Sequence, residues 1–188
     1  MSAGSYRKIN YTLRPAKAIE RRMFCDLFQR LTPFGAVHTY RYVGFGSIYF
    51  ADFNLFHRIL GFNDMLSIEK DVDQKDSFEF NKPYNCIRVE YRLASEVIAE
   101  LEWTEKMIVW LDYDCPLNTE VLADIASVCA NAKSGTIFLV SVSVQPDKEP
   151  EESERAKYAA YHGKAFRIAD YCKLEWGTRC PPTSRGST

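Results

Sequence analysis

A glycine-rich turn and a distant glutamate are the clearest candidates for ligand binding in this sequence. Gly44-Phe45-Gly46-Ser47 follows an aromatic and β-branched stretch and precedes a stretch with helical spacing of apolar residues. Glycines at such a turn let the backbone approach a ligand closely, and the helix start presents free N–H groups. Glu69 comes 23 residues after Gly46, where a carboxylate can accept hydrogen bonds from both hydroxyls of a ribose. The spacing fits one nucleotide-type ligand, whereas a tight turn and a solvated strand end are the purely structural alternatives.

The segment Asp112-Tyr113-Asp114 offers two carboxylates at the end of a strongly apolar stretch. Alternate side chains of an extended chain point the same way, so both carboxylates would lie on one side. Such a pair can orient an amine or hydroxyl of a substrate, act as a base, or hold a divalent ion. A loop with an aspartate cap and a turn at Pro116 is the structural alternative. Cys115 has no histidine near it in sequence, which favours an inert thiol over a nucleophile.

Two further patterns narrow the chemistry. The dinucleotide pattern G-x-G-x-x-G needs a third small residue, and this sequence has the bulky Tyr49 at that position. An NAD or FAD interpretation is therefore weakened. Neither cysteines nor histidines cluster at the spacing of metal ligands, so no metal site is predicted from them.

Composition and charge limit the class of protein. The 188 residues carry a net charge of -1, which gives no global case for a nucleic-acid or membrane partner. Residues 1–30 are nevertheless basic, a mild hint of phosphate contacts. No apolar run approaches the ~18–20 residues that span a bilayer. The six cysteines form no C-x-x-C pair and the N-terminus has no secretory pattern, so we expect a reduced, cytoplasmic protein.

Hydrophobic patterning predicts the elements that position the candidate residues. Strands are expected at 39–43, 65–68, 86–90, 107–111 and 136–144, and helices at 16–31, 48–60, 94–102 and from Asn118 or Thr119 onward. The segment 71–84 gives no recognisable element. The alternation predicts an α/β fold, a Rossmann-like, doubly wound, mostly parallel sheet of about five strands with flanking helices. Ligands bind such sheets beyond the carboxyl ends of the strands, which would bring the glycine turn, Glu69 and the aspartates to one edge.

Apolar spacing also predicts buried helix faces and the organisation of the chain. The buried face of helix 16–31 is expected to hold Ile19, Met23, Phe24, Leu27, Phe28 and Leu31. That of the helix after residue 118 is expected to hold Val121, Leu122, Ile125, Val128 and Cys129. We expect a basic amphipathic helix in residues 1–35, the Rossmann-like core in 36–146, and a charged, proline-rich helix and tail in 147–188. An exposed sheet edge after the fifth strand could pair with a protein partner or a second copy.

Over residues 36–145 the arrangement resembles the class I S-adenosylmethionine-dependent methyltransferases, of which the chain would be a divergent or truncated member. Gly44, Phe45, Gly46 and Ser47 look like the glycine-rich first motif of that family. Glu69 looks like the acidic ligand of the cofactor ribose. The resemblance therefore implies that these five residues bind S-adenosylmethionine.

The same resemblance extends to two later turns. Arg92-Leu93-Ala94-Ser95 is similar to the turn that contacts the adenine, which makes Leu93 and Ala94 candidate cofactor contacts. Asp112 and Asp114 fall where family members place their fourth motif, next to the transferred methyl, and are the candidate catalytic residues. The family usually has an acidic residue near the end of its first strand, at the amino-acid part of the cofactor. The stretch 40–43 of this sequence has none.

Three kinds of function are compatible with this sequence, and one of them is a protein that acts on nucleic acid through its basic N-terminal helix. The resemblance implies a methyltransferase that uses S-adenosylmethionine, with a small molecule, a nucleic acid or a protein as an acceptor that the sequence does not identify. The alternative is a non-catalytic Rossmann-like module that binds a nucleotide or a protein, alone or as part of a longer protein. The missing acidic residue of the first strand favours this alternative.

Overall fold

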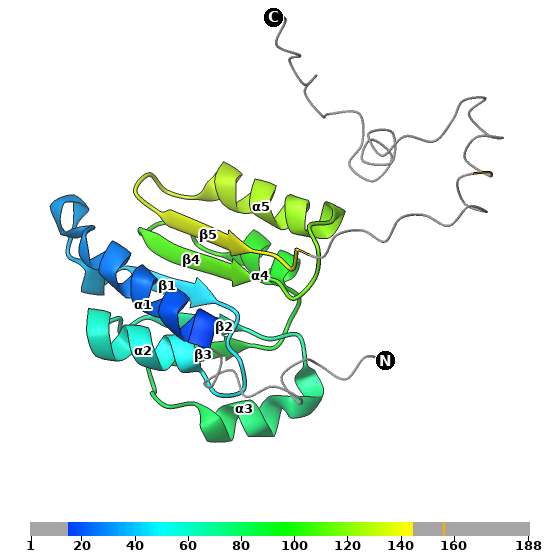
Figure 1. Cartoon of the computed structure of the whole chain (residues 1–188), viewed down its shortest axis with the longest axis horizontal. Helices are drawn as coiled ribbons and strands as arrows, with labels where there is room; N and C mark the ends of the chain where they lie inside the picture. Colours follow the sequence, from blue (N-terminus) through cyan, green and yellow to red (C-terminus); the bar gives the residue numbers. More distant parts are fainter. Residues whose placement is uncertain (1–14, 145–155, 157–188) are drawn as a thin grey trace, which may run out of the picture.

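The computed structural model describes residues 15–144 and residue 156, and helices and strands alternate along this part of the chain (Figure 1). The helices are α1 (Pro15–Gln29), α2 (Ala51–Leu60), α3 (Lys75–Asn81), α4 (Ala94–Glu100) and α5 (Thr119–Asn131). The strands are β1 (Arg41–Gly44), β2 (Met65–Ile68), β3 (Ile87–Glu90), β4 (Met107–Asp112) and β5 (Ile137–Ser141). Short 3-10 turns, η3 (Thr32–Phe34), η4 (Val37–Thr39) and η5 (Val72–Gln74), lie in the connections.

The strands of the described residues form one sheet in the order β3-β2-β1-β4-β5, with every neighbouring pair parallel. The chain builds outward from β1 to β3 and then crosses back to add β4 and β5 on the other side of β1. This confirms the predicted Rossmann-like α/β fold. The strand order reverses between β1 and β4, and ligands of such sheets bind at this switch point. Gly44 lies there, paired in register with Ser67 of β2 and Trp110 of β4.

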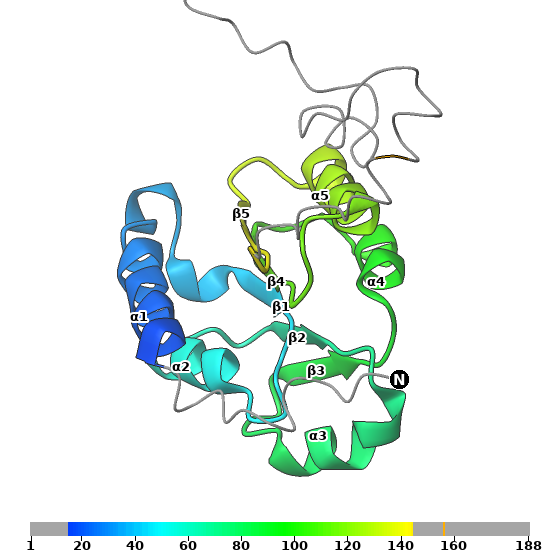
Figure 2. The ribbon, with the colours of Figure 1, turned by 45° about the vertical axis from the view of Figure 1, so that its right-hand side comes forward.

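Helices cover both faces of the sheet. In Figure 2, α1, α2 and α3 lie on one face, and α4 and α5 lie on the other. The first face holds an aromatic core that includes Phe28, Tyr42, Phe53, Phe56 and Trp110. The second face holds a mainly aliphatic core that includes Val43, Ile98, Val109, Leu111 and Val128. Because the central strands are covered on both faces, β2 and most of β4 are continuous buried runs.

Local backbone chemistry sets the ends of two helices. Phe50 has φ 47 and ψ 39, a left-handed conformation that cannot belong to a right-handed helix, so α2 begins at Ala51 and not at residue 48 as predicted. Gly61 ends α2 with φ 75 and donates its N–H to the carbonyl of His57, the C-terminal cap expected of a glycine. The Asn118 side chain accepts a hydrogen bond from the Val121 N–H and caps α5.

The predicted buried face of the first helix is wrong in part. Helix α1 buries Arg21, Cys25 and Phe28 against the aromatic core. The apolar residues that remain exposed are Ile19, Met23 and Leu27, at 60, 64 and 47 %. Both rows of side chains recur at the three-and-four spacing of a helix face, so apolar periodicity alone could not choose between them.

Four further differences separate prediction from structure. The segment 71–84, to which the sequence pattern assigned no element, contains η5 and the short helix α3, of which only Phe78 is buried. Strand β1 begins at Arg41, because the preceding residues form η4, and β5 is shorter than predicted. Cys129 of α5 is exposed, on the side away from the sheet core. The helix and tail predicted in 147–188 lie outside the described residues, apart from Ala156.

Candidate functional site

A chain of hydrogen bonds joins the glycine turn after β1 to the end of β2. The N–H of Gly46 donates to Ser67 Oγ at 3.1 Å, and this hydroxyl donates to Glu69 Oε1 at 3.2 Å. Ser67 is completely buried, the last but one residue of β2. The parallel register of β1 and β2 brings the two segments together, so Gly46 and Glu69 belong to one site at the carboxyl edge of the sheet.

The two glycines of the turn are required by close approach. A Cβ at Gly46 would collide with Ser67 Oγ and lie 2.9 Å from Glu69 Oε1. A Cβ at Gly44 would lie 2.7 Å from Tyr42 Oη and 3.1 Å from the Trp110 carbonyl oxygen. Real Cβ atoms do not approach polar atoms so closely without a shift of the neighbour. Only glycine therefore lets the turn after β1 lie against the ends of β2 and β4.

Glu69 is a carboxyl in an unusual environment. Burial raises the pKa of Glu69 to about 9, and the hydrogen bond from Ser67 opposes this only in part. At neutral pH the group is therefore largely a neutral carboxylic acid, which can donate one hydrogen bond and accept others. A second polar atom of the turn, Ser47 Oγ, is buried and makes no hydrogen bond. The turn thus holds unused hydrogen-bonding capacity beside an acid.

The predicted adenine contacts lie at the same edge of the sheet. Leu93 precedes α4 as its N-cap residue and is 55 % exposed, and Ala94 is the first residue of that helix. They follow β3, the strand next to β2. The N–H of Leu93 donates a hydrogen bond to Glu96 Oε2 at 3.3 Å, which holds the backbone of this turn.

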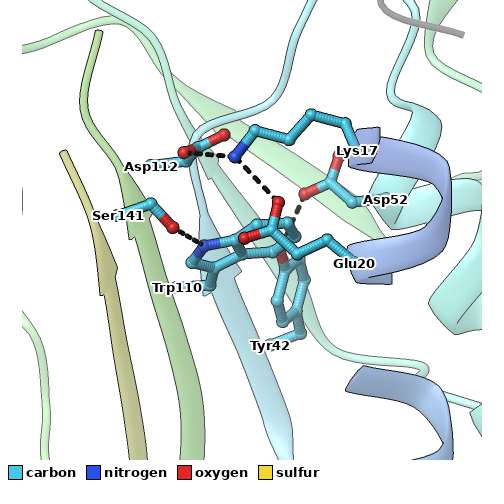
Figure 3. A network of polar contacts seen from close by, with 7 residues as sticks. All are labelled: Lys17, Glu20, Tyr42, Asp52, Trp110, Asp112 and Ser141. Carbon is cyan, nitrogen blue, oxygen red and sulfur yellow. Dashed lines mark hydrogen bonds and ion pairs between the residues drawn. The ribbon is translucent and has the colours of Figure 1, made fainter. Parts of the chain in front are cut away.

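Asp112 is held by a lysine from the first helix (Figure 3). Lys17 Nζ lies 2.8 Å from Asp112 Oδ1 and 2.9 Å from Glu20 Oε2, one turn along α1. The same ammonium lies 5.5 Å from the centre of the Trp110 ring, whose Nε1 donates to Ser141 Oγ at 3.1 Å. Burial alone would lower the pKa of Lys17, but its hydrogen bonds to Asp112 and Glu20 outweigh this and raise it. Lys17 is thus a permanent cation at the end of β4.

Tyr113 points to the opposite face of the sheet from Asp112. Its hydroxyl donates to Asp124 Oδ2 of α5 at 2.7 Å, and its ring meets the ring of Phe45 edge to face, with centroids 5.0 Å apart. The Phe45–Tyr113 contact ties the turn after β1 to the turn after β4. Asp114, two residues beyond Asp112, is exposed.

Three residues at this edge were missed by the sequence reasoning. Tyr42 of β1 donates its hydroxyl to Asp52 Oδ2 of α2 at 2.7 Å, and both side chains are buried. Burial raises the pKa of Asp52, against the opposing effects of the Tyr42 hydrogen bond and of Arg21. Arg21 of α1 is only 7 % exposed. The basic composition of the N-terminal helix was the only signal, and it did not single out this arginine.

Other kinds of site are absent from the part of the chain that the structure describes. Within residues 15–144 and 156, no three His, Cys, Asp or Glu side chains could together hold a metal ion. No described helix has the length and apolar character to cross a membrane. A cavity of about 290 Å³ lies among charged residues that include Arg41, Arg88, Arg92 and Glu100. None of the predicted site residues lines it, so we place the site by the switch point and not by this cavity.

Comparison with known proteins identifies the family of the chain. A family model described as "Putative O-methyltransferase" matches residues 9–178, which includes the entire sheet and all five helices described above. No curated protein matches the chain. The match covers most of the sequence and agrees with the parallel sheet and its switch point. The chain belongs to this O-methyltransferase family.

Proposed function

We propose that the chain transfers a methyl group from S-adenosylmethionine to a hydroxyl oxygen of an acceptor. The observation that carries this proposal is the hydrogen-bonded connection from Gly46 through Ser67 to Glu69 beside the β1/β4 switch point. It combines a glycine backbone with an acid directly beside it at the carboxyl edge of the sheet. The family of the chain supports methyl transfer as the reaction.

The residues present fit this cofactor. The glycine turn, residues 44–47, would lie along the cofactor, with the unpaired Ser47 hydroxyl able to donate to it. Glu69 would bind the ribose hydroxyls, because its carboxyl keeps an oxygen that Ser67 does not use. Leu93 and Ala94 would contact the adenine, where the exposed Leu93 side chain offers apolar surface. The bound cofactor supplies an electrophilic methyl group on a sulfonium.

The end of β4 supplies the groups for the acceptor. A hydroxyl acceptor must lose a proton, and the Asp112 carboxylate is the candidate base. Lys17 fixes the orientation of that carboxylate and, as a permanent cation, does not compete for the proton. Asp114 is the second candidate carboxylate of this turn. Positioning of donor and acceptor in line does much of the remaining work.

Equilibrium binding tests the proposal. Isothermal titration of the chain with S-adenosylmethionine and S-adenosylhomocysteine should give saturable binding, with NAD as the negative ligand. Glu69→Ala should weaken both by about tenfold or more, because the ribose loses hydrogen bonds to a charged or strongly polar partner. Asp73→Asn is the matched control, since Asp73 is an exposed carboxylate four residues further along.

Two results of this titration would contradict the proposal. Equal affinity of Glu69→Ala and the parent chain would remove Glu69 from the site. Binding of none of the adenosyl compounds would favour the non-catalytic Rossmann-like module over the enzyme.

A further inference from the structure

Arg21 is a buried cationic residue that makes no hydrogen bond or ion pair with any of the residues the structure describes. Its side chain lies on the face of α1 that packs toward the sheet, and only 7 % of the residue is exposed. Arg21 Nε is buried and makes no hydrogen bond. The hydrogen bonds and ion pairs of residues 15–144 include none to this side chain. The Nε–H has therefore lost its hydration without gaining an acceptor among the described residues, which is unfavourable.

The position of Arg21 on α1 brings this charge toward the switch point, since Lys17, four residues earlier on the helix, contacts Asp112 at the carboxyl end of β4. Arg21 acts electrostatically on Tyr42 and Asp52, whose side chains are hydrogen-bonded to each other at 2.7 Å. Tyr42 Oη in turn lies against Gly44, 2.7 Å from where a Cβ would be. Arg21 therefore acts on the β1 tyrosine that contacts the first glycine of the turn.

Two cationic residues of α1, Lys17 and Arg21, differ in the ion pairs that they form. Lys17, one helical turn before Arg21, makes ion pairs with both Glu20 and Asp112 (Figure 3). Arg21 acts electrostatically on the Asp52 carboxyl, but the two side chains form no ion pair within 4.0 Å. Asp52 is already bonded to Tyr42. Among the residues that the structure describes, Arg21 is thus a donor group without an ion-paired anion.

We propose that Arg21 binds a ligand carboxylate at the β1/β4 switch point. We assign this carboxylate to the amino-acid end of S-adenosylmethionine, so this inference rests on the function proposed above. Guanidinium and carboxylate groups form paired, charge-assisted hydrogen bonds, which suits a planar anion. An acceptor that carries a carboxylate is the other possible source of the same chemistry.

Ligands that differ by this one group provide the test. S-adenosylmethionine and its decarboxylated form differ only in the carboxylate, and 5′-methylthioadenosine lacks the whole amino-acid end. The parent chain should bind S-adenosylmethionine about 10- to 100-fold more tightly than the decarboxylated compound. Arg21→Met, which keeps an apolar stem, should bind the two with nearly equal affinity and should bind 5′-methylthioadenosine as the parent does. Arg22→Met is the matched control, because Arg22 is the exposed neighbour on the same helix.

A stability measurement separates this role from a structural one. Removal of an unpaired buried charge should leave the free chain at least as stable, so the urea midpoint of Arg21→Met should not fall below that of the parent. If Arg21 only balances the charge of Asp52, the variant should lose stability and keep the parent's ligand preferences. That outcome would overturn the proposal.

Benzoate is the probe for an acceptor carboxylate. Thermal stabilisation of the chain by benzoate that disappears in Arg21→Met and persists in Arg22→Met would assign the carboxylate to the acceptor. Binding of no adenosyl compound by the parent would refute the proposed function, and the benzoate response alone would then decide the role of Arg21. If Arg21→Met changes neither the preference for S-adenosylmethionine over its decarboxylated form nor the response to benzoate, Arg21 is not a carboxylate ligand.

Discussion

Lys17 and Asp112 lie 95 positions apart in the sequence, yet the ammonium of one contacts the carboxylate of the other at 2.8 Å. This contact joins the first turns of α1 to the carboxyl end of β4, directly at the switch point of the sheet. It is reinforced by Glu20 and by the face of the Trp110 ring. Helix α1 therefore belongs to the candidate site as much as to the core.

Loss of the Lys17 ammonium should cost measurable stability. Lys17→Met removes two ion pairs whose side chains are about a quarter to a third exposed, and we expect a loss of about 1 kcal/mol in the free energy of unfolding. Lys82→Met, which removes an exposed ion pair with Glu79, should lower the free energy of unfolding by only about 0.3 kcal/mol. Urea unfolding monitored by circular dichroism measures both. Equal effects of the two variants would mean that the Lys17–Asp112 contact adds nothing to the fold.

The Glu69 carboxyl predicts a specific dependence of stability on pH. Its pKa is about 9 in the folded chain against an ordinary value of 4.5, so the folded state holds the proton more tightly than the unfolded state. The stabilisation from that bound proton is complete below the ordinary value and is lost as the pH rises toward about 9, by at most about 1.4 kcal/mol per pH unit. Glu69→Gln, which cannot ionise, should therefore gain stability relative to the parent between about pH 5 and about pH 8. Parallel stability curves for the two proteins would refute the raised pKa.

The same carboxyl should couple ligand binding to proton release. If Glu69 binds the ribose hydroxyls as a carboxylate, binding near neutral pH must remove the proton that the free chain holds. Titration of S-adenosylhomocysteine in two buffers of different ionisation enthalpy should then show a release approaching one proton, and Glu69→Gln should show none. Identical heats in both buffers for the parent would mean that Glu69 stays protonated when the ligand binds.

Loss of the Tyr42 hydroxyl should lower the stability of the chain. Tyr42→Phe leaves the buried Asp52 carboxyl without its side-chain donor, which should cost about 1–3 kcal/mol of stability. Tyr91→Phe removes an exposed hydrogen bond to Glu79 and should cost far less. Thermal unfolding of the two variants makes the comparison. A Tyr42→Phe protein as stable as Tyr91→Phe would show that Asp52 finds another partner.

The glycine turn gives a prediction on packing. Gly46→Ala should destabilise the chain, since the added methyl collides with Ser67 Oγ and approaches Glu69 Oε1 and the Phe50 ring. Ser67→Ala in the same chain should recover part of the loss, because it removes the nearest of these atoms. A Gly46→Ala protein with unchanged stability would show that the turn does not lie against β2 as described.

The sheet and its switch point could be predicted because their signals are local. Strands β2 and β4 are short, mainly apolar runs, and parallel sheets covered on both faces require such runs. Handedness and connection rules then place the ends of β1, β2 and β4 at one edge. The positions of Gly46 and Glu69 at that edge follow from the sequence for the same reason.

The contribution of α1 to the site could not be predicted, because it depends on pairing across the whole chain. Two rows of α1 side chains have helical spacing, and the row that contains Arg21 is buried although Ile19, Met23 and Leu27 are more apolar. The choice is made by partners far away in sequence, such as Asp112 for Lys17. Helix α3 escaped prediction for a simpler reason, since Phe78 is the only residue that it buries.

The most direct test of the account is the crystal structure of the chain with S-adenosylhomocysteine. The account predicts the ligand at the carboxyl edge between β1 and β4, with its backbone contacts along residues 44–47 and its ribose hydroxyls on the Glu69 carboxyl. A ligand bound elsewhere, for example in the charged cavity near Arg41 and Arg88, would contradict the site described here.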